Sequence, residues 1–210
     1  MKKIILIDDH TVILEGLSLL LPKIYPCKIV GRAVSGEKGV ELAKIQNPDI
    51  IFMDLVMPGG WSGIESIEKI RMFDKNVKII CLTMLTDAHS IHNAIKAGAN
   101  GYLIKNASAE DMKLCMECIS GNEIYIHPEL IEFFVMGWKN QKIARKMILN
   151  DLDFEILSDI SKGLTTDDIA GKVFRSPETI RSRRKMLLKK FNCSNSAELV
   201  AYALRNNLLI

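Results

Sequence analysis

The sequence has no long apolar run. A membrane-spanning helix needs about 20 consecutive apolar residues, and apolar stretches such as residues 3–7 are far shorter. No signal peptide is visible at the charged start, which leads directly into that short stretch. We therefore expect a cytoplasmic protein that does not bind a membrane.

Cysteines are few and irregularly spaced. The five cysteines form an odd set, so a disulfide framework is not expected. Cys115 and Cys118 do form a C-x-x-C pair. Positions i, i+3, i+4 and i+7 of one helical stripe hold Met112, Cys115, Met116 and Ile119. We interpret the pair as two thiols on a packed helix, with a metal or redox pair as the alternative.

Net charge is small but unevenly distributed. The chain of 210 residues carries a formal charge of +3. Residues 1–121 contain 14 basic and 14 acidic residues, and residues 151–168 contain six acids and one base. Residues 171–190, by contrast, contain eight bases and one acid. Positive charge is therefore concentrated in one segment near the C-terminus.

The first 121 residues alternate short apolar runs with amphipathic ones. Strands are expected at residues 3–7, 28–33, 49–53, 77–82 and 101–104. Helices are expected at residues 11–21, 36–46, 62–73, 88–97 and 108–120. This alternation predicts a doubly wound α/β domain with five parallel strands, in the flavodoxin-like order 2-1-3-4-5.

The remainder of the chain has a different pattern. Residues 122–147 are interpreted as a linker with a helix after Pro128. From residue 148 onward we expect a small all-α domain, with helical patterns near residues 150–162, 165–173, 176–191 and 195–206. No low-complexity tract or repeat is present. The predicted organisation is thus a domain at 1–121, a linker at 122–147 and a four-helix domain at 148–210.

Carboxylates follow two strands that should be neighbours. Asp8 and Asp9 end the first strand, and Asp54 directly follows the third. Three anions at one sheet edge need a cation, and an all-oxygen site with open positions suits Mg²⁺. Thr83 and Lys105 stand at the ends of the next two strands. A hydroxyl, an ammonium and a divalent cation around Asp54 describe a phosphoryl site with Asp54 as nucleophile.

These residues resemble a known family. The features are Asp8-Asp9, Asp54 with Met57-Pro58, Thr83, Tyr102 and Lys105. In that combination the first 120 residues resemble the receiver domain of two-component response regulators. The resemblance implies that Asp54 accepts a phosphoryl group from a sensor histidine kinase or a small phosphodonor.

The resemblance also implies a metal site. Asp9, Asp54 and the backbone carbonyl of Val56 would hold Mg²⁺, and Asp8 would act partly through a water molecule. Lys105 would pair with the phosphoryl oxygens.

The resemblance further implies a switch. Thr83 and Tyr102 would shift inward when the phosphoryl group arrives. One departure from the family lies between Pro58 and Ile64, where the loop is one residue longer than usual. Trp61 in this loop is either a packing anchor or a contact near the phosphosite.

The C-terminal basic segment reads as a helix with two faces. Ser176 and Pro177 are typical of a helix start. Steps of 100° place Glu178, Arg181, Ser182, Lys185 and Lys189 within an arc of about 100°. A shorter helical pattern precedes this segment after Thr165. Two such helices predict a helix-turn-helix whose second helix enters the major groove of double-stranded DNA.

Residues 149–209 resemble the LuxR-type DNA-binding domain, and with the N-terminal domain they resemble the NarL/FixJ response regulators. The matching stretches are "LNDLDFEIL", "GLTTDDIAGKVF", "SPETIRSRRKMLLKKF" and "NSAELVAYALRNNLL". The resemblance implies that base edges are read by Arg181, Ser182 and Lys185. It implies that phosphates are contacted by Thr165, Thr179, Arg184 and Lys189.

The family also implies a homodimer on DNA. The last helix, including Val200, Ala203 and Leu204, would form the dimer contact. Asn192 stands where the family usually has glycine, and asparagine tolerates the left-handed backbone that such a turn needs.

We therefore expect a phosphorylation-controlled DNA-binding transcription regulator rather than a dedicated enzyme. One alternative is a DNA-binding regulator with a degenerate receiver that ignores phosphorylation. A second is an aspartyl-phosphate hydrolase, disfavoured because Val56 replaces the second aspartate of the D-x-D pair that such sites use.

Overall fold

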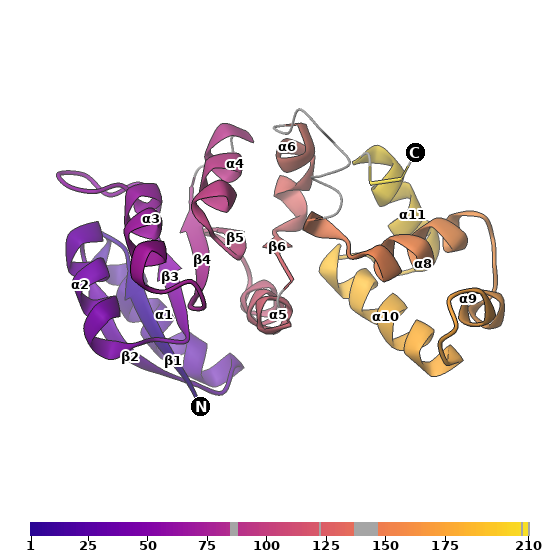
Figure 1. Cartoon of the computed structure of the whole chain (residues 1–210), viewed down its shortest axis with the longest axis horizontal. Coiled ribbons are helices and arrows are strands. Elements are labelled where there is room, and N and C mark those ends of the chain that lie inside the picture. Colours follow the sequence, from indigo (N-terminus) through magenta and orange to yellow (C-terminus); the bar gives the residue numbers. More distant parts are fainter. Residues whose placement is uncertain (85–87, 122, 137–146, 207, 210) are drawn as a thin grey trace. The chain divides into compact units, whose positions relative to one another are not determined.

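The computed structural model describes residues 1–84, 88–121, 123–136, 147–206 and 208–209, without the side chains of Thr83, Ala88 and Met136. The chain divides into two compact units, Met1–Ile126 and His127–Ile210. Figure 1 shows a sheet with flanking helices in the first unit and helices in the second. Each unit is described by itself below.

The N-terminal unit is built on one parallel sheet with the strand order β2-β1-β3-β4-β5-β6. Its strands are β1 (Lys2–Ile7), β2 (Cys27–Ala33), β3 (Ile50–Met53), β4 (Lys78–Thr83), β5 (Gly101–Ile104) and β6 (Tyr125–Ile126). The predicted order of the first five strands is confirmed. The short β6 was not predicted, because two residues carry no periodic signal, and it falls within the range interpreted as a linker.

Helices cover both faces of this sheet. They are α1 (Thr11–Ile24), α2 (Gly36–Gln46), α3 (Gly63–Phe73), α4 (Ala88–Ala97) and α5 (Ala109–Ser120). The contacts between α1 and α5, and those joining α2 to α3 and α3 to α4, separate the helices into two layers. The predicted doubly wound fold is therefore confirmed.

The core of this unit follows from the apolar strands. All four residues of β3 and the last four of β1 are buried, as expected for central strands covered on both faces. Cys115 and Cys118 lie in the same core, on α5. This placement supports the interpretation of that pair as packed thiols.

The C-terminal unit is helical. It contains the 3-10 turn η1 (Pro128–Leu130) and helices α6 (Ile131–Met136), α8 (Asp151–Ser161), α9 (Thr166–Lys172), α10 (Pro177–Lys190) and α11 (Ser196–Arg205). The helix predicted after Pro128 is present as η1 and α6. Helices α8 to α11 correspond to the four helices predicted for residues 148–210.

Two local features close the C-terminal unit. The Tyr202 hydroxyl of α11 donates a hydrogen bond of 2.7 Å to the Pro128 carbonyl, which attaches η1 to the last helix. Asn192 ends the turn after α10 with φ +51°, so the predicted left-handed backbone at this position is confirmed.

Among the described residues, no helix combines the length and apolar character that crossing a membrane requires.

Candidate functional site

The register of the sheet brings Asp8 and Asp54 to one edge. Ile7 of β1 pairs with Met53 of β3, so the residue after each strand emerges at the same level. The Asp54 amide donates to the Ile7 carbonyl at 2.8 Å, which continues the ladder by one bond. Asp8 and Asp54 are each only 3% exposed. Backbone pairing thus brings two buried acidic residues to the same level of the sheet edge.

Lys105 reaches both carboxylates from the end of β5. Its Nζ lies 2.7 Å from Asp54 Oδ2 and 2.8 Å from Asp8 Oδ2. The Val56 amide donates to the other Asp54 oxygen, Oδ1, at 3.2 Å. Both oxygens of Asp54 therefore accept hydrogen bonds from donors within the domain.

The pKa values in the pocket reflect burial and pairing. Burial raises the pKa of Asp54 above the usual aspartate value, and hydrogen bonds from Lys105 and the Val56 amide oppose that rise in part. Burial tends to lower the pKa of Lys105, but its hydrogen bonds to Asp54 and Asp8 outweigh burial and raise that pKa. The lysine is therefore a permanent cation at neutral pH.

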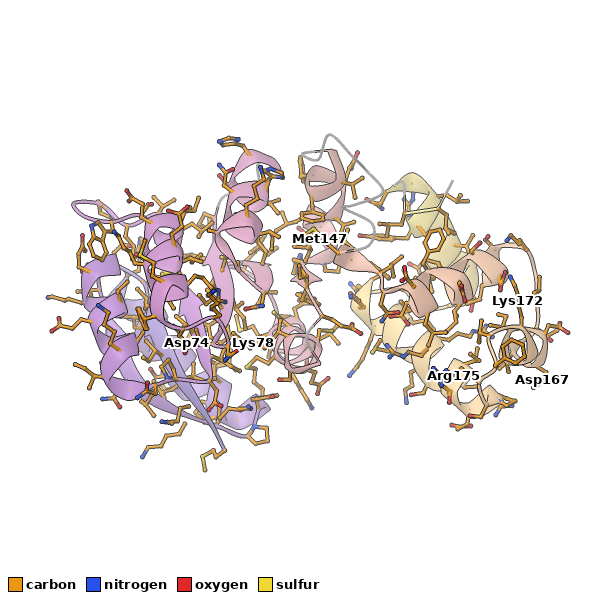
Figure 2. The ribbon with its side chains drawn as sticks, in the orientation of Figure 1. Asp74, Lys78, Met147, Asp167, Lys172 and Arg175 are labelled. Atoms are coloured by element: carbon orange, nitrogen blue, oxygen red, sulfur yellow. The ribbon has the colours of Figure 1, made fainter. Side chains whose placement is uncertain are left out.

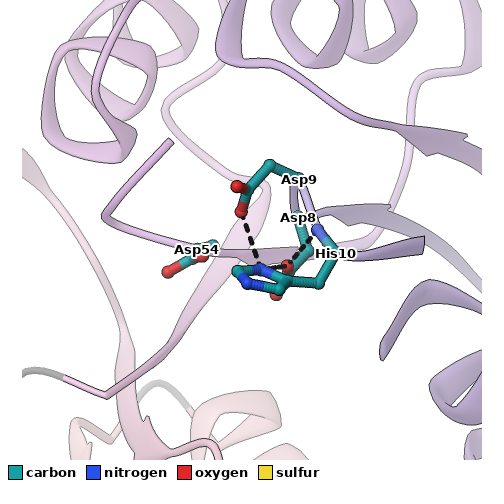
Figure 3. A group of neighbouring side chains, drawn as sticks. All are labelled: Asp8, Asp9, His10 and Asp54. Atoms are coloured by element: carbon teal, nitrogen blue, oxygen red, sulfur yellow. Dashed lines mark hydrogen bonds and ion pairs between the residues drawn. The ribbon is translucent and has the colours of Figure 1, made fainter. Parts of the chain in front are cut away.

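A third carboxylate and an imidazole complete the cluster. Asp8, Asp9, His10 and Asp54 each offer one ligand atom, and these atoms lie within 4.8 Å of one another (Figure 3). The Oδ1 atom of Asp9 is buried and makes no hydrogen bond to any described residue, although His10 Nδ1 lies 2.9 Å away.

This donor set fits a divalent cation. Among the described residues, the Lys105 ammonium contacts two of the three carboxylates, those of Asp8 and Asp54. A buried oxygen of the third, Asp9 Oδ1, makes no hydrogen bond to these residues. Oxygen ligands with excess negative charge are what Mg²⁺ prefers in proteins. The predicted roles of Asp9, Asp54, Asp8 and the Val56 carbonyl as metal ligands remain predictions.

The loop after β3 is held close to the pocket. A Cβ at Gly63 would collide with the backbone of Asp54 and Leu55, so glycine lets α3 begin directly beside the pocket. Farther along the loop, the Trp61 amide donates to Glu37 at 2.6 Å, and Lys69 Nζ lies 5.5 Å from the centre of the Trp61 ring. The Trp61 side chain is itself exposed, so both interpretations of Trp61, a packing anchor and a contact near the phosphosite, remain predictions.

The structure describes the side chain of Tyr102, one of the two predicted switch residues, and only the backbone of the other, Thr83. Tyr102 of β5 is fully buried and is paired in register with Cys81 on one side and Ile126 on the other. Thr83 ends β4 opposite Ile104, but its side chain lies outside the described part of the structure. The switch role of both residues remains a prediction.

In the C-terminal unit, α9 and α10 form the expected helix pair. Thr165 caps α9 in a capping box with Asp168, and Ser176 caps α10 by accepting from the Thr179 amide at 3.1 Å. The turn between them contains Phe174, which has φ +54° and is 91% exposed. A bulky residue in this left-handed region is strained. Sequence reasoning did not identify this position.

Most residues predicted to contact DNA are accessible. Exposed side chains belong to Thr165, Arg181, Ser182, Lys185 and Lys189, and Thr179 is half-buried. Arg184 differs from these, because its Nη1 donates to Thr166 at 2.8 Å and its Nη2 to Ser196 at 2.7 Å. Arg184 therefore joins α9, α10 and α11, and its predicted phosphate contact would have to coexist with these bonds.

Several other bases of the segment 171–190 serve the fold. Lys172 binds both carboxylate oxygens of the buried Asp159, at 2.6 and 2.7 Å. Lys172 is the last residue of α9 and Asp167 lies in its first turn, and both are labelled in Figure 2. Arg183 lies 3.4 Å from the buried Asp153. The positive charge available to a partner is consequently smaller than the sequence count of eight bases.

The last helix presents only part of the expected dimer face. Ala203 is fully buried, so its expected place in a dimer contact is not supported. Leu204 is exposed and Val200 half-buried, and both line a shallow apolar depression between α8 and α11. A helix periodicity identifies one apolar face but does not tell which apolar residues the domain core covers.

His10 is the site residue that sequence reasoning left without a role. Its backbone amide donates to Asp8 Oδ1 at 2.8 Å and its Nδ1 lies 3.0 Å from the same oxygen. The position directly after two aspartates was the available signal, but a histidine at a helix start carries no orientation until the fold is known.

Comparison with known proteins agrees with both units. The model of the response regulator receiver domain matches residues 4–117, and the model of the luxR family of bacterial regulatory proteins matches residues 147–203. The oxygen regulatory protein NreC of Staphylococcus epidermidis is 32% identical over 215 residues, which cover 99% of each chain.

Solved structures show the same fold. A LuxR-family two-component response regulator from Aurantimonas has a TM-score of 0.61 and 28% identity, over 65% of this chain and 96% of that one. RcsB, solved as two dimers bound to two parallel DNAs, has a TM-score of 0.60 and 22% identity, over 97% and 98% of the two chains.

Proposed function

This chain belongs to the response regulators that combine a receiver domain with a LuxR-type DNA-binding domain, and we propose that Asp54 is the residue through which a sensor histidine kinase controls its binding to DNA. Residues 1–121 would receive the signal and residues 148–210 would bind DNA. Because the kinase's phosphoryl group and the DNA meet in the cytoplasm, we place the protein there.

The observation that carries this proposal is the bond of Lys105 to both Asp8 and Asp54. It holds the Asp54 carboxylate at the mouth of the pocket, beside an ammonium that can move to a phosphoryl oxygen. A fixed cation at the place where negative charge arrives is the arrangement that phosphoryl transfer needs.

The transfer itself is a displacement at phosphorus. An Asp54 carboxylate oxygen attacks, the new P–O bond forms, and the P–N bond to the kinase histidine breaks, so the imidazole leaves. Mg²⁺ held by Asp9, Asp54, the Val56 carbonyl and, through water, Asp8 would neutralise the phosphoryl oxygens. Lys105 would transfer its hydrogen bond from Asp54 to the phosphoryl group.

The conformational change would then involve one residue of β4, Thr83, and one residue of β5, Tyr102. Tyr102 is already fully buried, so we propose that Thr83 moves toward the phosphoryl group and that Tyr102 holds the inward position. The receiver only assists its own phosphorylation and loss of the phosphoryl group, and acts otherwise as a switch.

DNA binding is assigned to the exposed side of α9 and α10. Arg181, Ser182 and Lys185 would face base edges, and Thr165, Thr179, Arg184 and Lys189 would contact phosphates. A homodimer would place one α10 in each half-site of the operator. The RcsB dimers seen on DNA provide a precedent for this arrangement in a protein of the same fold.

The decisive experiment compares wild type with Asp54→Ala. With Mg²⁺ and a small phosphodonor or beryllofluoride, wild type is expected to dimerise and to bind a selected operator more tightly. Light scattering and a gel-shift assay measure both effects. If Asp54→Ala responds in the same way as wild type, the regulator ignores phosphorylation and the alternative with a degenerate receiver is correct.

A second experiment tests the DNA face with two exposed lysines on one helix. Lys185→Ala should weaken operator binding by about 1–3 kcal/mol and relax sequence preference, because a base contact is lost. Lys189→Ala should weaken binding to all sequences and lower the salt dependence by about one counterion. Equal losses on operator and random DNA for Lys185→Ala would contradict its base-reading role.

A further inference from the structure

His10 has an orientation that its place in α1 does not explain. It occupies the N-cap position of that helix, where a side chain usually accepts a hydrogen bond from the first turn. The His10 side chain makes no such bond to the described helix. It turns instead toward the carboxylates of Asp8 and Asp9 (Figure 3).

The distances are those of neighbouring ligands around one cation. His10 Nδ1 lies 3.0 Å from Asp8 Oδ1 and 2.9 Å from Asp9 Oδ1. Two ligands at right angles around an ion, each with a bond of about 2.1 Å, lie roughly 3 Å apart. The contact with Asp8 is also a hydrogen bond, whereas Asp9 Oδ1 makes none to the described residues. The Nδ1 atom is therefore almost equally close to both carboxylates, as a ligand atom that faces a shared ion would be.

We propose that His10 is a nitrogen ligand of the cation site, so that this site accepts first-row transition-metal ions such as Co²⁺ or Ni²⁺ as well as Mg²⁺. The proposal rests on the cation site of the proposed function. Imidazole is a good ligand for these metals, whereas Mg²⁺ is bound by oxygen and retains its waters. The His10 side chain is 62% exposed, so its ring can adjust to an arriving ion.

Selectivity is the consequence that can be measured. Mg²⁺ would be held by the oxygens and would depend little on His10. A transition-metal ion would gain an additional bond from Nδ1. Removing the imidazole should therefore change the ratio of the two affinities, and a role confined to orienting the carboxylates would weaken both ions equally.

The experiment uses the full-length protein and two metals. Co²⁺ binding is followed by its visible absorption, and Mg²⁺ binding by calorimetry, for wild type and His10→Ala. The dissociation constant for Co²⁺ is expected to rise at least about tenfold, and that for Mg²⁺ less than about threefold. The visible absorption bands of bound Co²⁺ should also shift in His10→Ala, because a nitrogen ligand is lost from the ion.

Two controls frame this result. His89→Ala removes an exposed histidine of α4 and should leave both affinities unchanged. Asp9→Asn should weaken both ions, because a carboxylate ligand is lost. Absence of Co²⁺ binding, an equal loss of both ions in His10→Ala, or a Co²⁺ signal that survives Asp9→Asn would each overturn the proposal.

Phosphorylation separates this inference from the proposed function. Wild type and His10→Ala should both be phosphorylated on Asp54 in Mg²⁺, as intact-mass measurement would show. If wild type is not phosphorylated while the Co²⁺ selectivity is found, the proposed function fails and the nitrogen ligand stands. If wild type is phosphorylated but the Co²⁺ selectivity is absent, the proposed function stands and the nitrogen ligand fails.

Discussion

Lys105 and Lys190 are both buried lysines, yet they serve different regions in different ways. Lys105 has an 8% exposed side chain and faces two of the three clustered carboxylates. Lys190 is 2% exposed and donates to the neutral Ile148 carbonyl at 2.8 Å. The receiver pocket keeps an excess of negative charge that a divalent cation would offset. The bond of Lys190 instead connects α10 to the chain before α8. The two lysines therefore differ in what their bonds do: those of Lys105 hold a carboxylate cluster together, and that of Lys190 joins two segments of the helical unit.

The largest effect is expected from Lys105→Met. This change leaves the buried Asp8 and Asp54 without their shared cation, and breaking a buried ion pair costs about 3–5 kcal/mol. Unfolding in urea with EDTA should show this loss in the N-terminal unit. Mg²⁺ should restore more stability to the variant than it adds to wild type, because the carboxylates then regain a cation. An equal gain in stability from Mg²⁺ in both proteins would contradict the claim that Lys105, unlike Lys190, offsets the charge of a carboxylate cluster.

Lys190→Met should have a smaller effect, confined to the C-terminal unit. Methionine fills a similar volume but leaves the Ile148 carbonyl without this donor, and an unsatisfied buried acceptor costs about 1–3 kcal/mol. Circular dichroism during urea unfolding measures the loss, and phosphorylation of Asp54 serves as the control that should not change. A variant as stable as wild type would show that the Lys190 bond contributes nothing to the scaffold.

Phe174→Asn tests whether the scaffold contains local strain. Asparagine tolerates the left-handed backbone at this turn better than phenylalanine, so the variant should be stabilised by up to about 1 kcal/mol. The matched control is Arg175→Asn, whose backbone is outside the left-handed region, and which should bring no gain. Thermal unfolding of both variants decides the question, and a gain of equal size in the two would refute the strain.

The smallest expected effect is the pH dependence of Asp54→Asn. Because burial raises the pKa of Asp54, the folded state binds this proton more tightly than the unfolded state, and ionised Asp54 lowers stability at neutral pH. Asparagine carries no charge, so the variant should unfold at a higher temperature than wild type at pH 7 in EDTA. This gain should shrink as pH falls through the raised pKa and vanish below the unfolded value of about 3.9. A gain that is constant with pH would exclude the charge of Asp54 as its cause.

Much of the fold and pocket could be predicted from local signals. Apolar strands alternating with helices indicated the sheet, and Asp8, Asp54 and Lys105 stand directly after strands, whose ends coincide in any such sheet. The extra strand β6 and the orientation of the His10 side chain could not be predicted in this way. A two-residue strand has no period, and a side chain at a helix start can turn to either side.

The sequence by itself determined the order of strands and helices, the meeting of carboxylates with Lys105, and a capped basic helix in the second unit. These follow from periodicity and from residues at element ends, which depend on neighbours in the chain. Only the tertiary structure decided which bases remain exposed: Lys189 is accessible, while the adjacent Lys190 is buried and Arg184 binds Thr166 and Ser196. The physical reason is that a charged side chain takes the partners that packed helices bring to it, and those partners come from distant parts of the chain.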